Sequence, residues 1–196
     1  MVHTISKGSF IRGPALVFGL SLPGGEAMEA VTAILTRRSI RKYRPAEVSE
    51  DIIRKVLECG FAAPTARNKR PLHFVLVKDR AVLTELGSMH TFTSMATACA
   101  FSVLICADSA LEERRQFMDQ DGSAAAENML LGAHAMGLGG VWCGIQEGGD
   151  REIAVSRICS LPEGIAPIAL MVFGVPDEAR EVPERFDAGR IHADKW

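Results

Sequence analysis

Residues 121–142 read DGSAAAENMLLGAHAMGLGGVW and contain the clearest structural signal in the chain. Apolar positions recur at helical spacing over 121–136, which predicts a long helix. One face of this helix collects small and apolar side chains, at Ala125, Met129, Gly132, Ala133 and Met136. Small residues there allow another helix to approach closely, and Gly137 is suited to ending the helix. Residues 141–145 then predict a strand.

Further helices and strands are predicted on both sides of this stretch. Apolar spacing predicts helices at 27–37, 82–89 and 150–159, and apolar runs predict strands at 73–77, 101–107 and 165–175. Another helix is expected between Ser49, its N-cap, and Gly60, the residue just beyond its end, while Asp150 is expected to cap the helix that follows it. Two helices precede the first strand and the later order is mixed, so the class is α+β.

Composition narrows the range of functions. The 196-residue chain has a formal net charge of −2, without the basic bias of a nucleic-acid-binding protein. Five cysteines without a C-x-x-C pair argue against a zinc ribbon or a disulfide framework and favour a reducing cytoplasm. No apolar run reaches the roughly 20 residues that a membrane-spanning helix needs. We therefore expect a cytoplasmic protein with neither nucleic acid nor membrane as a partner.

The chain divides into two unequal parts. Residues 1–25 are rich in Gly, Ser and Pro, lack periodicity and end at Pro23-Gly24-Gly25, which predicts a flexible N-terminal extension or arm. Residues 26–196 are expected to form one domain. The five histidines show no metal-ligand spacing, so no metal site is expected.

A basic cluster, RRSIRKY, occupies residues 37–43. Forked donors from Arg37, Arg38 and Arg41, with the hydroxyl of Ser39, suit a phosphate or another anionic group. However, cations are favoured near a helix C-terminus without any ligand. These residues alone leave the two interpretations equally weighted.

A second motif, APTARNKRP, occupies residues 63–71 and joins a helix to a strand. The Asn68 amide both donates and accepts hydrogen bonds, which suits the edge of a flat heterocycle. The segment is also dense in turn-forming residues, so a plain surface loop is the favoured interpretation of these residues alone.

The third motif, GLGGVWCG at 137–144, is glycine-rich but precedes a strand and follows a helix, the reverse of a dinucleotide-binding loop. Glycines at Gly139, Gly140 and Gly144 would let the backbone approach a planar ligand closely. The fourth motif is the charged and aromatic C-terminus, residues 185–196, which is either a solvated end or a basic clamp that returns to the site.

Taken together, the motifs resemble the nitroreductase family, specifically its compact members. The resemblance runs from about residue 28 to residue 196 and also includes FGVPDE at 173–178. It implies an FMN enzyme with a central mixed sheet flanked by helices. It further implies an intertwined homodimer with FMN in the cleft between subunits, and makes the alanine-rich helix a candidate dimer helix.

The resemblance also assigns the FMN site. The phosphate, ribityl chain and pyrimidine edge would be contacted by Arg37, Arg38, Ser39 and Arg41. The other subunit would contribute Pro64, Thr65 and Asn68. The isoalloxazine ring would lie near Trp142, Cys143 and Gly144, and the phosphate site would be completed by Arg190 and Lys195.

Two positions depart from the family pattern. Many relatives have Gln-Pro-Trp where this chain has Arg70-Pro71-Leu72, which makes the substrate hard to infer by analogy. Larger relatives have a Glu-Gly pair beside the flavin where this chain has Gly144-Ile145, which suggests neutral backbone contacts at the ring.

The implied activity is a ping-pong transfer of two electrons from NADH or NADPH to a nitroaromatic, a quinone or a similar acceptor. No catalytic protein acid or base is expected, because the cofactor carries the chemistry. Two alternatives stay open. One is a specialised flavin enzyme, for reductive dehalogenation or flavin-consuming oxygen chemistry, and the other is a flavin-binding or sensing module without turnover.

Overall fold

A computed structural model of the protein describes residues 28–196. The N-terminal extension predicted for residues 1–25 lies outside the described residues. The helices are α1 (Ala30–Thr36), α2 (Glu50–Phe61), α3 (Arg80–Ser88), α4 (Arg115–Ala135) and α5 (Asp150–Ile158), with short 3-10 helices η1 (Ala66–Asn68), η2 (Thr91–Ala98) and η3 (Ala188–Arg190). The strands are β1 (Tyr43–Arg44), β2 (Leu72–Val77), β3 (Phe101–Asp108), β4 (Gly139–Gly144) and β5 (Ile165–Pro176).

The strands form one five-stranded sheet around β5, which pairs with β3, β4 and β1, while β2 pairs with β3. All these pairs are antiparallel. The parallel pairing expected of a mixed sheet is confined, among the described residues, to an isolated bridge between Ser39 and Gly140. The α+β class is confirmed.

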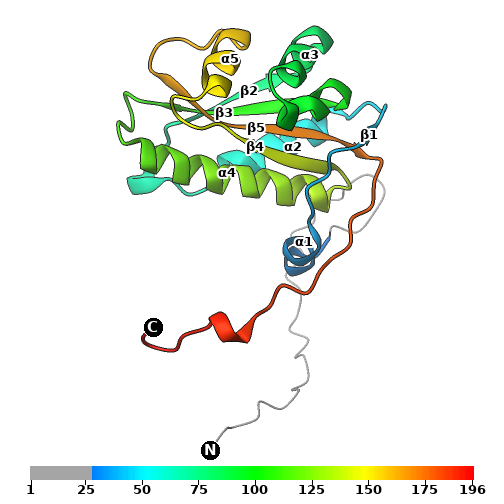
Figure 1. The fold of residues 1–196 in the computed structure, drawn as a ribbon, viewed down its shortest axis with the longest axis vertical. Coiled ribbons are helices and arrows are strands. Elements are labelled where there is room, and N and C mark those ends of the chain that lie inside the picture. Colours follow the sequence, from blue (N-terminus) through cyan, green and yellow to red (C-terminus); the bar gives the residue numbers. More distant parts are fainter. Residues whose placement is uncertain (1–27) are drawn as a thin grey trace, which may run out of the picture.

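Helices cover both faces of the sheet, giving three layers (Figure 1). On one face, side chains of α3 and α5 such as Leu83, Leu86 and Val155 pack against β3 and β5. On the other face, α2 and α4 pack against the same strands, with Met129 among the fully buried residues. Because β3 and β5 are covered on both sides, their sequences are continuously apolar rather than alternating.

Helix α4 begins at Arg115, so the predicted start at residue 121 is wrong. The additional turns are polar, and Arg115 holds them through Asp119 Oδ1 at 2.8 Å, Glu152 Oε1 at 3.1 Å and the Pro167 carbonyl at 3.1 Å. The predicted end is confirmed, because Gly137 adopts a φ of +81°, which favours glycine.

The small residues of α4 pack within the chain. Ala125, Ala126 and Ala133 are fully buried in the layer between α4 and the sheet. A methyl group on Gly132 would lie 2.5 Å from the Cys59 sulfur of α2. The close approach predicted for this face is therefore used between α2, α4 and the sheet.

Two predicted helix ends are wrong. Gly60 lies inside α2, where a Cβ would meet Met129 at 3.0 Å and Phe74 at 3.1 Å, so its role is close packing. Helix α5 is capped by Gly149, with Asp150 in its first turn. Ser49 is confirmed as the N-cap of α2, since its side chain accepts a hydrogen bond from Ile52 N.

Helix α1 and the C-terminal tail, residues 177–196, extend away from the three layers (Figure 1). The predicted apolar stripe of α1 is exposed: Val31, Ile34 and Leu35 are 58%, 57% and 62% accessible. Along the tail, Phe186 and Trp196 are also exposed. These apolar surfaces are left without a partner within the described residues. Among those residues, no helix is both long enough and apolar enough to cross a membrane.

Candidate functional site

The site begins where the segment after α1 meets strand β4. Ser39 forms the parallel bridge with Gly140, and Ile40 N–H donates to the Gly140 carbonyl at 3.0 Å. The next residue, Arg41, is fixed through its backbone N–H, which donates to Glu178 Oε1 at 2.6 Å. The basic cluster is thus held against β4, and the Arg41 side chain is placed beside residues 142–144.

These two segments line a cleft of about 520 Å³. Its lining comprises Arg41, Val141, Trp142, Cys143, Gly144 and Arg151, together with the η2 residues Thr91, Phe92, Ser94, Met95, Thr97 and Ala98. A neighbouring hollow of about 590 Å³ shares Trp142, Gly144 and Arg151 with it. The cleft has the size of a small-molecule site, for which roughly 300–1,000 Å³ is usual.

The glycines of β4 have different roles in this structure. A Cβ on Gly139 would lie 2.7 Å from Ile40 Cγ2, and a Cβ on Gly140 would lie 2.8 Å from the Phe173 ring. Both are therefore required by packing within the chain, contrary to the ligand-approach role predicted for them. At Gly144 the nearest atom to a Cβ would be Trp142 Nε1, at 3.9 Å, so this backbone faces open space.

The Cys143 thiol is buried and donates a hydrogen bond to the Phe92 carbonyl at 3.2 Å. Burial raises the pKa of Cys143 to about 11, although the positive charges of Arg41 and Arg151 oppose this shift. Only a thiolate is an effective nucleophile. The cysteine in the cleft is consequently a neutral packing group at neutral pH.

Arg37 and Arg38 are engaged within the chain. Arg37 Nε lies 3.1 Å from Glu127 Oε1 on α4, and Arg38 Nε donates to the Glu181 carbonyl at 3.1 Å. Desolvation, followed by the nearby charges of Arg185 and Arg37, lowers the pKa of Arg38. Several positive charges are therefore gathered here, which favours an anionic ligand beside them.

Pro64, Thr65 and Asn68 lie in a different place from the cleft. They line a separate hollow of about 240 Å³ with apolar side chains that include Phe61 and Phe74. Thr65 Oγ1 accepts from Arg70 N at 3.0 Å, and Asn68 Oδ1 accepts from Arg70 Nε at 2.9 Å. The structure does not bring these residues to the cleft of their own chain.

The loop that carries these residues, loop 64–70, has an unfavourable backbone conformation. Arg67, Asn68 and Arg70 all have φ between 52° and 54°, in the left-handed region. For residues other than glycine this region costs about 1–2 kcal/mol each, and somewhat less for asparagine. Such conformations persist only when surrounding contacts hold them.

Two buried carboxylates that sequence analysis missed contact loop 64–70. Glu112 is 1% exposed, and its Oε2 lies 2.7 Å from Arg67 and 3.2 Å from Lys69. Asp121 is 5% exposed, and its Oδ1 accepts from Ala66 N at 2.8 Å. Nothing in the sequence around Glu112 signals this contact, and Asp121 looks like an ordinary helix residue.

The environment of Glu112 favours its ionised form. Burial by itself raises the pKa of Glu112, but hydrogen bonds from Arg114 N, Lys69 and Arg67 outweigh this effect and lower it. At Asp121, by contrast, Oδ2 has no hydrogen-bond partner within the described part of the chain.

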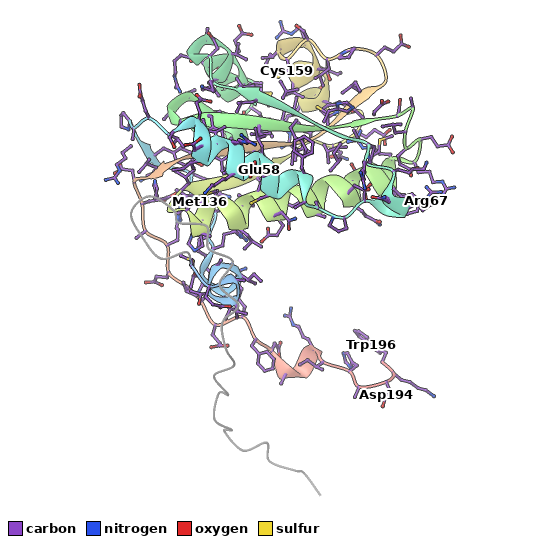
Figure 2. All side chains as sticks on the ribbon, turned by 180° about the vertical axis from the view of Figure 1, so that it is seen from behind. Glu58, Arg67, Met136, Cys159, Asp194 and Trp196 are labelled. Carbon is purple, nitrogen blue, oxygen red and sulfur yellow. The ribbon has the colours of Figure 1, made fainter. Side chains whose placement is uncertain are left out.

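Arg190 and Lys195 are not among the residues that line the cleft of their own chain, and the tail that carries them runs away from the three layers (Figures 1 and 2). Arg190 is exposed and pairs with Asp187 in the same short turn, at 3.0 Å. Near the end, His192 stacks on Trp196 with 4.1 Å between ring centroids. A basic clamp that closes on its own site is therefore absent from the described chain.

The donor set of the cleft matches a flat heterocycle that carries an anionic group. Arg41 offers a planar, charged donor, Trp142 offers an aromatic side chain, and Gly144 offers backbone with open space above it. The further cations Arg37 and Arg38 lie on the same segment as Arg41. Adjacent parts of this segment could thus hold the aromatic body and the phosphate of a single ligand.

Comparison with known proteins identifies the family of this chain. The model of the Nitroreductase family matches residues 34–90 and 90–175. A protein of Methanothermobacter thermautotrophicus, with the provisional name NADH dehydrogenase/NAD(P)H nitroreductase, is 39% identical over 169 residues, covering 86% of this chain and 88% of its own.

Two solved structures are also similar. One, from Bacteroides thetaiotaomicron and provisionally named in the same way, is 34% identical with a TM-score of 0.80, covering 88% of this chain and 99% of its own. The other, a provisional nitroreductase from Desulfovibrio desulfuricans in complex with FMN, is 26% identical with a TM-score of 0.73, covering 85% and 97% of the two chains. The match spans both the sheet and the basic cluster, and this chain belongs to the nitroreductase family.

Proposed function

We propose that the protein is an FMN-dependent oxidoreductase that passes two electrons from NADH or NADPH to an acceptor. Nitroaromatics, quinones and similar compounds are the proposed acceptors, in a ping-pong cycle in which the donor leaves before the acceptor binds. The observation that carries this proposal is the meeting of Arg41 with Trp142, Cys143 and Gly144 at one cleft, in a chain of the nitroreductase family.

The residues of this chain would bind and orient the cofactor. Arg41, which lines the cleft, would donate to the pyrimidine edge, while Arg37, Arg38 and Ser39 would face the phosphate and ribityl chain. Gly144 and its neighbours would contribute backbone near the ring. When bound, FMN supplies the two-electron carrier between donor and acceptor, and the protein supplies position and electrostatics.

We further propose a homodimer with FMN at the interface. Thr65 and Asn68 line another hollow, and neither they nor Arg190 and Lys195 line the cleft of their own chain, so we propose that they serve the cleft of the second subunit. The exposed apolar residues of α1 and the tail support this arrangement, because contiguous apolar surface usually marks an interface. A cytoplasmic location belongs to the same proposal, and the five free thiols support it.

The test is purification without added flavin, followed by anaerobic titration with NADH and with NADPH. We expect a yellow protein with one FMN per subunit that either nicotinamide bleaches, and whose colour returns on adding a quinone or a nitroaromatic compound. A colourless protein that takes up no FMN would contradict the proposal. Bound FMN without turnover would instead favour the flavin-binding module, and product analysis in air would identify flavin-consuming chemistry.

A further inference from the structure

Loop 64–70 is held in place by side chains from outside the loop. Ala66 N–H is bound by Asp121 of α4, and Arg67 and Lys69 are bound by Glu112, which precedes α4. Arg67 also lies over the Phe117 ring of α4, 5.3 Å from its centroid. Figure 2 shows Arg67 at one end of the body. The loop is therefore fastened to α4 and to the segment that precedes it.

The fastened positions surround Asn68. Arg67 and Lys69, its two neighbours, share the single Glu112 carboxylate, and Ala66 is tied down by Asp121. The Asn68 side chain itself lies on the 240 Å³ hollow. With φ near 54° on both Arg67 and Asn68, the direction of this side chain depends on a backbone that the loop would not prefer alone.

Stability of the fold is a weak explanation for this arrangement. Burying a carboxylate requires its removal from water, which ion pairs offset only in part. The partners of Glu112 are themselves partly exposed, with side-chain exposures of 49% for Arg67 and 32% for Lys69. Asp121 also buries Oδ2 without any partner in the described chain. Strained backbone and buried charge together are characteristic of sites where a ligand is positioned.

We propose that Glu112 and Asp121 are positioning residues for the cofactor site, and that they hold loop 64–70 so that Thr65 and Asn68 are presented to FMN. The inference rests on the proposed function, and it adds two residues that do not touch the cofactor themselves. Their effect is to reduce the ordering that loop 64–70 must undergo when FMN binds.

The test uses the FMN-loaded protein and follows FMN release by the rise in its fluorescence after dilution. Glu112→Gln removes the charge at nearly constant shape, and Asp121→Ala removes the acceptor for Ala66 N–H. We expect each to weaken FMN binding by about tenfold or more, as misplacement of a binding group does. Asp121→Asn keeps a carbonyl acceptor, so we expect its affinity to stay within about threefold of the parent protein.

A matched control separates positioning from loss of stability. Val77 is buried at the far end of β2 from loop 64–70, so Val77→Ala should lower the unfolding temperature without touching the loop. We expect FMN release from Val77→Ala to match that of the parent protein. Hydrogen exchange of the FMN-loaded protein supplies a second readout: exchange at residues 64–70 should rise in Glu112→Gln and Asp121→Ala but not in Val77→Ala.

Several results overturn the inference while leaving the proposed function intact. The first is FMN bound by Glu112→Gln and Asp121→Ala as tightly as by the parent protein. The second is an equal loss in Val77→Ala, and the third is an equal loss in Asp121→Asn, which excludes the Ala66 hydrogen bond as the cause. A parent protein that binds no FMN contradicts the proposed function itself. If Asp121→Ala does not fold, Glu112→Gln and the exchange data still decide the outcome.

Discussion

At the scale of single residues, the arginines of the basic cluster make different contacts. Arg37 is four-fifths buried and paired with Glu127, and Arg38 donates to main-chain carbonyls. Arg41 is anchored through its backbone to Glu178, which leaves its guanidinium to line the cleft. Arginines bound within the chain and an arginine that faces the cleft therefore coexist within five residues.

The double substitution Arg37→Ala with Arg41→Ala tests whether this cluster holds the cofactor. We expect FMN content to fall by about tenfold or more, because charge-assisted hydrogen bonds to an anionic ligand are lost. The free energy of unfolding should fall by only about 1 kcal/mol, since the Glu127 partner of Arg37 is 45% exposed and ion pairs that solvent reaches contribute little. Flavin absorbance and thermal unfolding of the purified protein measure the two effects.

Arg54 provides the matched control, because it pairs with Glu58 at 2.9 Å on the exposed face of α2, away from the cleft. Arg54→Ala should keep its full FMN content. Retention of flavin by the double variant would show that Arg37 and Arg41 are only structural charges.

The Cys143 thiol makes stability depend on pH in a predictable direction. With its pKa raised to about 11 in the folded protein, the thiol binds its proton more tightly than in the unfolded chain. The resulting stability is complete below the ordinary thiol pKa of about 8.5 and is lost as the pH rises through 11. Cys143→Ala should therefore reduce the alkaline loss of stability by on the order of 2 kcal/mol. Urea unfolding at several pH values from 8 to 11 measures this loss of stability. If the free energy of unfolding changes with pH in the same way in the two proteins, the raised pKa of Cys143 is not the cause.

At the scale of elements, strand β4 is packed closely at its start and lines the cleft at its end. Gly139 and Gly140 at its start are surrounded by Ile40 and Phe173, whereas Gly144 at its end faces open space. The same residue type is thus used first to bring the basic cluster against the sheet and then to expose backbone in the cleft.

A pair of alanine substitutions in β4 separates these two roles. Gly140→Ala places a methyl group 2.8 Å from Phe173 and 2.9 Å from Leu130, so it should destabilise the fold by about 1–3 kcal/mol. Gly144→Ala meets no such contact and should change stability by less than about 0.5 kcal/mol, yet weaken FMN binding. Urea unfolding and FMN titration of both variants give the comparison. A Gly144→Ala variant as unstable as Gly140→Ala would contradict the assignment of open space beside Gly144.

At the scale of the whole molecule, α1 and the tail carry apolar side chains away from the core. Ile34 and Leu35 are more than half exposed, and Phe186 and Trp196 are exposed on the tail. The core of the three layers does not need these residues, so the proposed second subunit is what would cover them.

Ile34→Glu with Leu35→Glu tests this account of the assembly. We expect a shift from dimer to monomer in sedimentation velocity, because charges would replace apolar contacts at the interface. FMN content should fall in parallel, since the proposed site needs both subunits. Ile153→Glu on α5, where the residue is 67% exposed on the body, is the control and should leave the protein dimeric. A double variant that remains dimeric with its FMN would exclude α1 from the interface.

Much of the fold was predictable because its signals are local. The apolar runs of β3 and β5, the Ser49 cap and the Gly137 stop each depend on a few neighbouring residues. The predictions for the start of α4 and for Gly60 were wrong because residues distant in the sequence determine the structure at both places. Arg115 is held by Glu152 and Pro167, and Gly60 is required by Met129 and Phe74.

The same distinction between local sequence and distant contacts applies to the candidate site. By itself, the sequence determined the α+β class, the order of the elements and the motifs that place the chain in its family, because spacing and residue type are properties of the chain. Only the tertiary structure decided that Arg41 meets Gly144 in one cleft and that Asn68 lies elsewhere. It also decided that Glu112 and Asp121 hold loop 64–70. Glu112 is 45 residues from Arg67 along the chain, so their 2.7 Å contact exists only after the sheet and α4 have packed together.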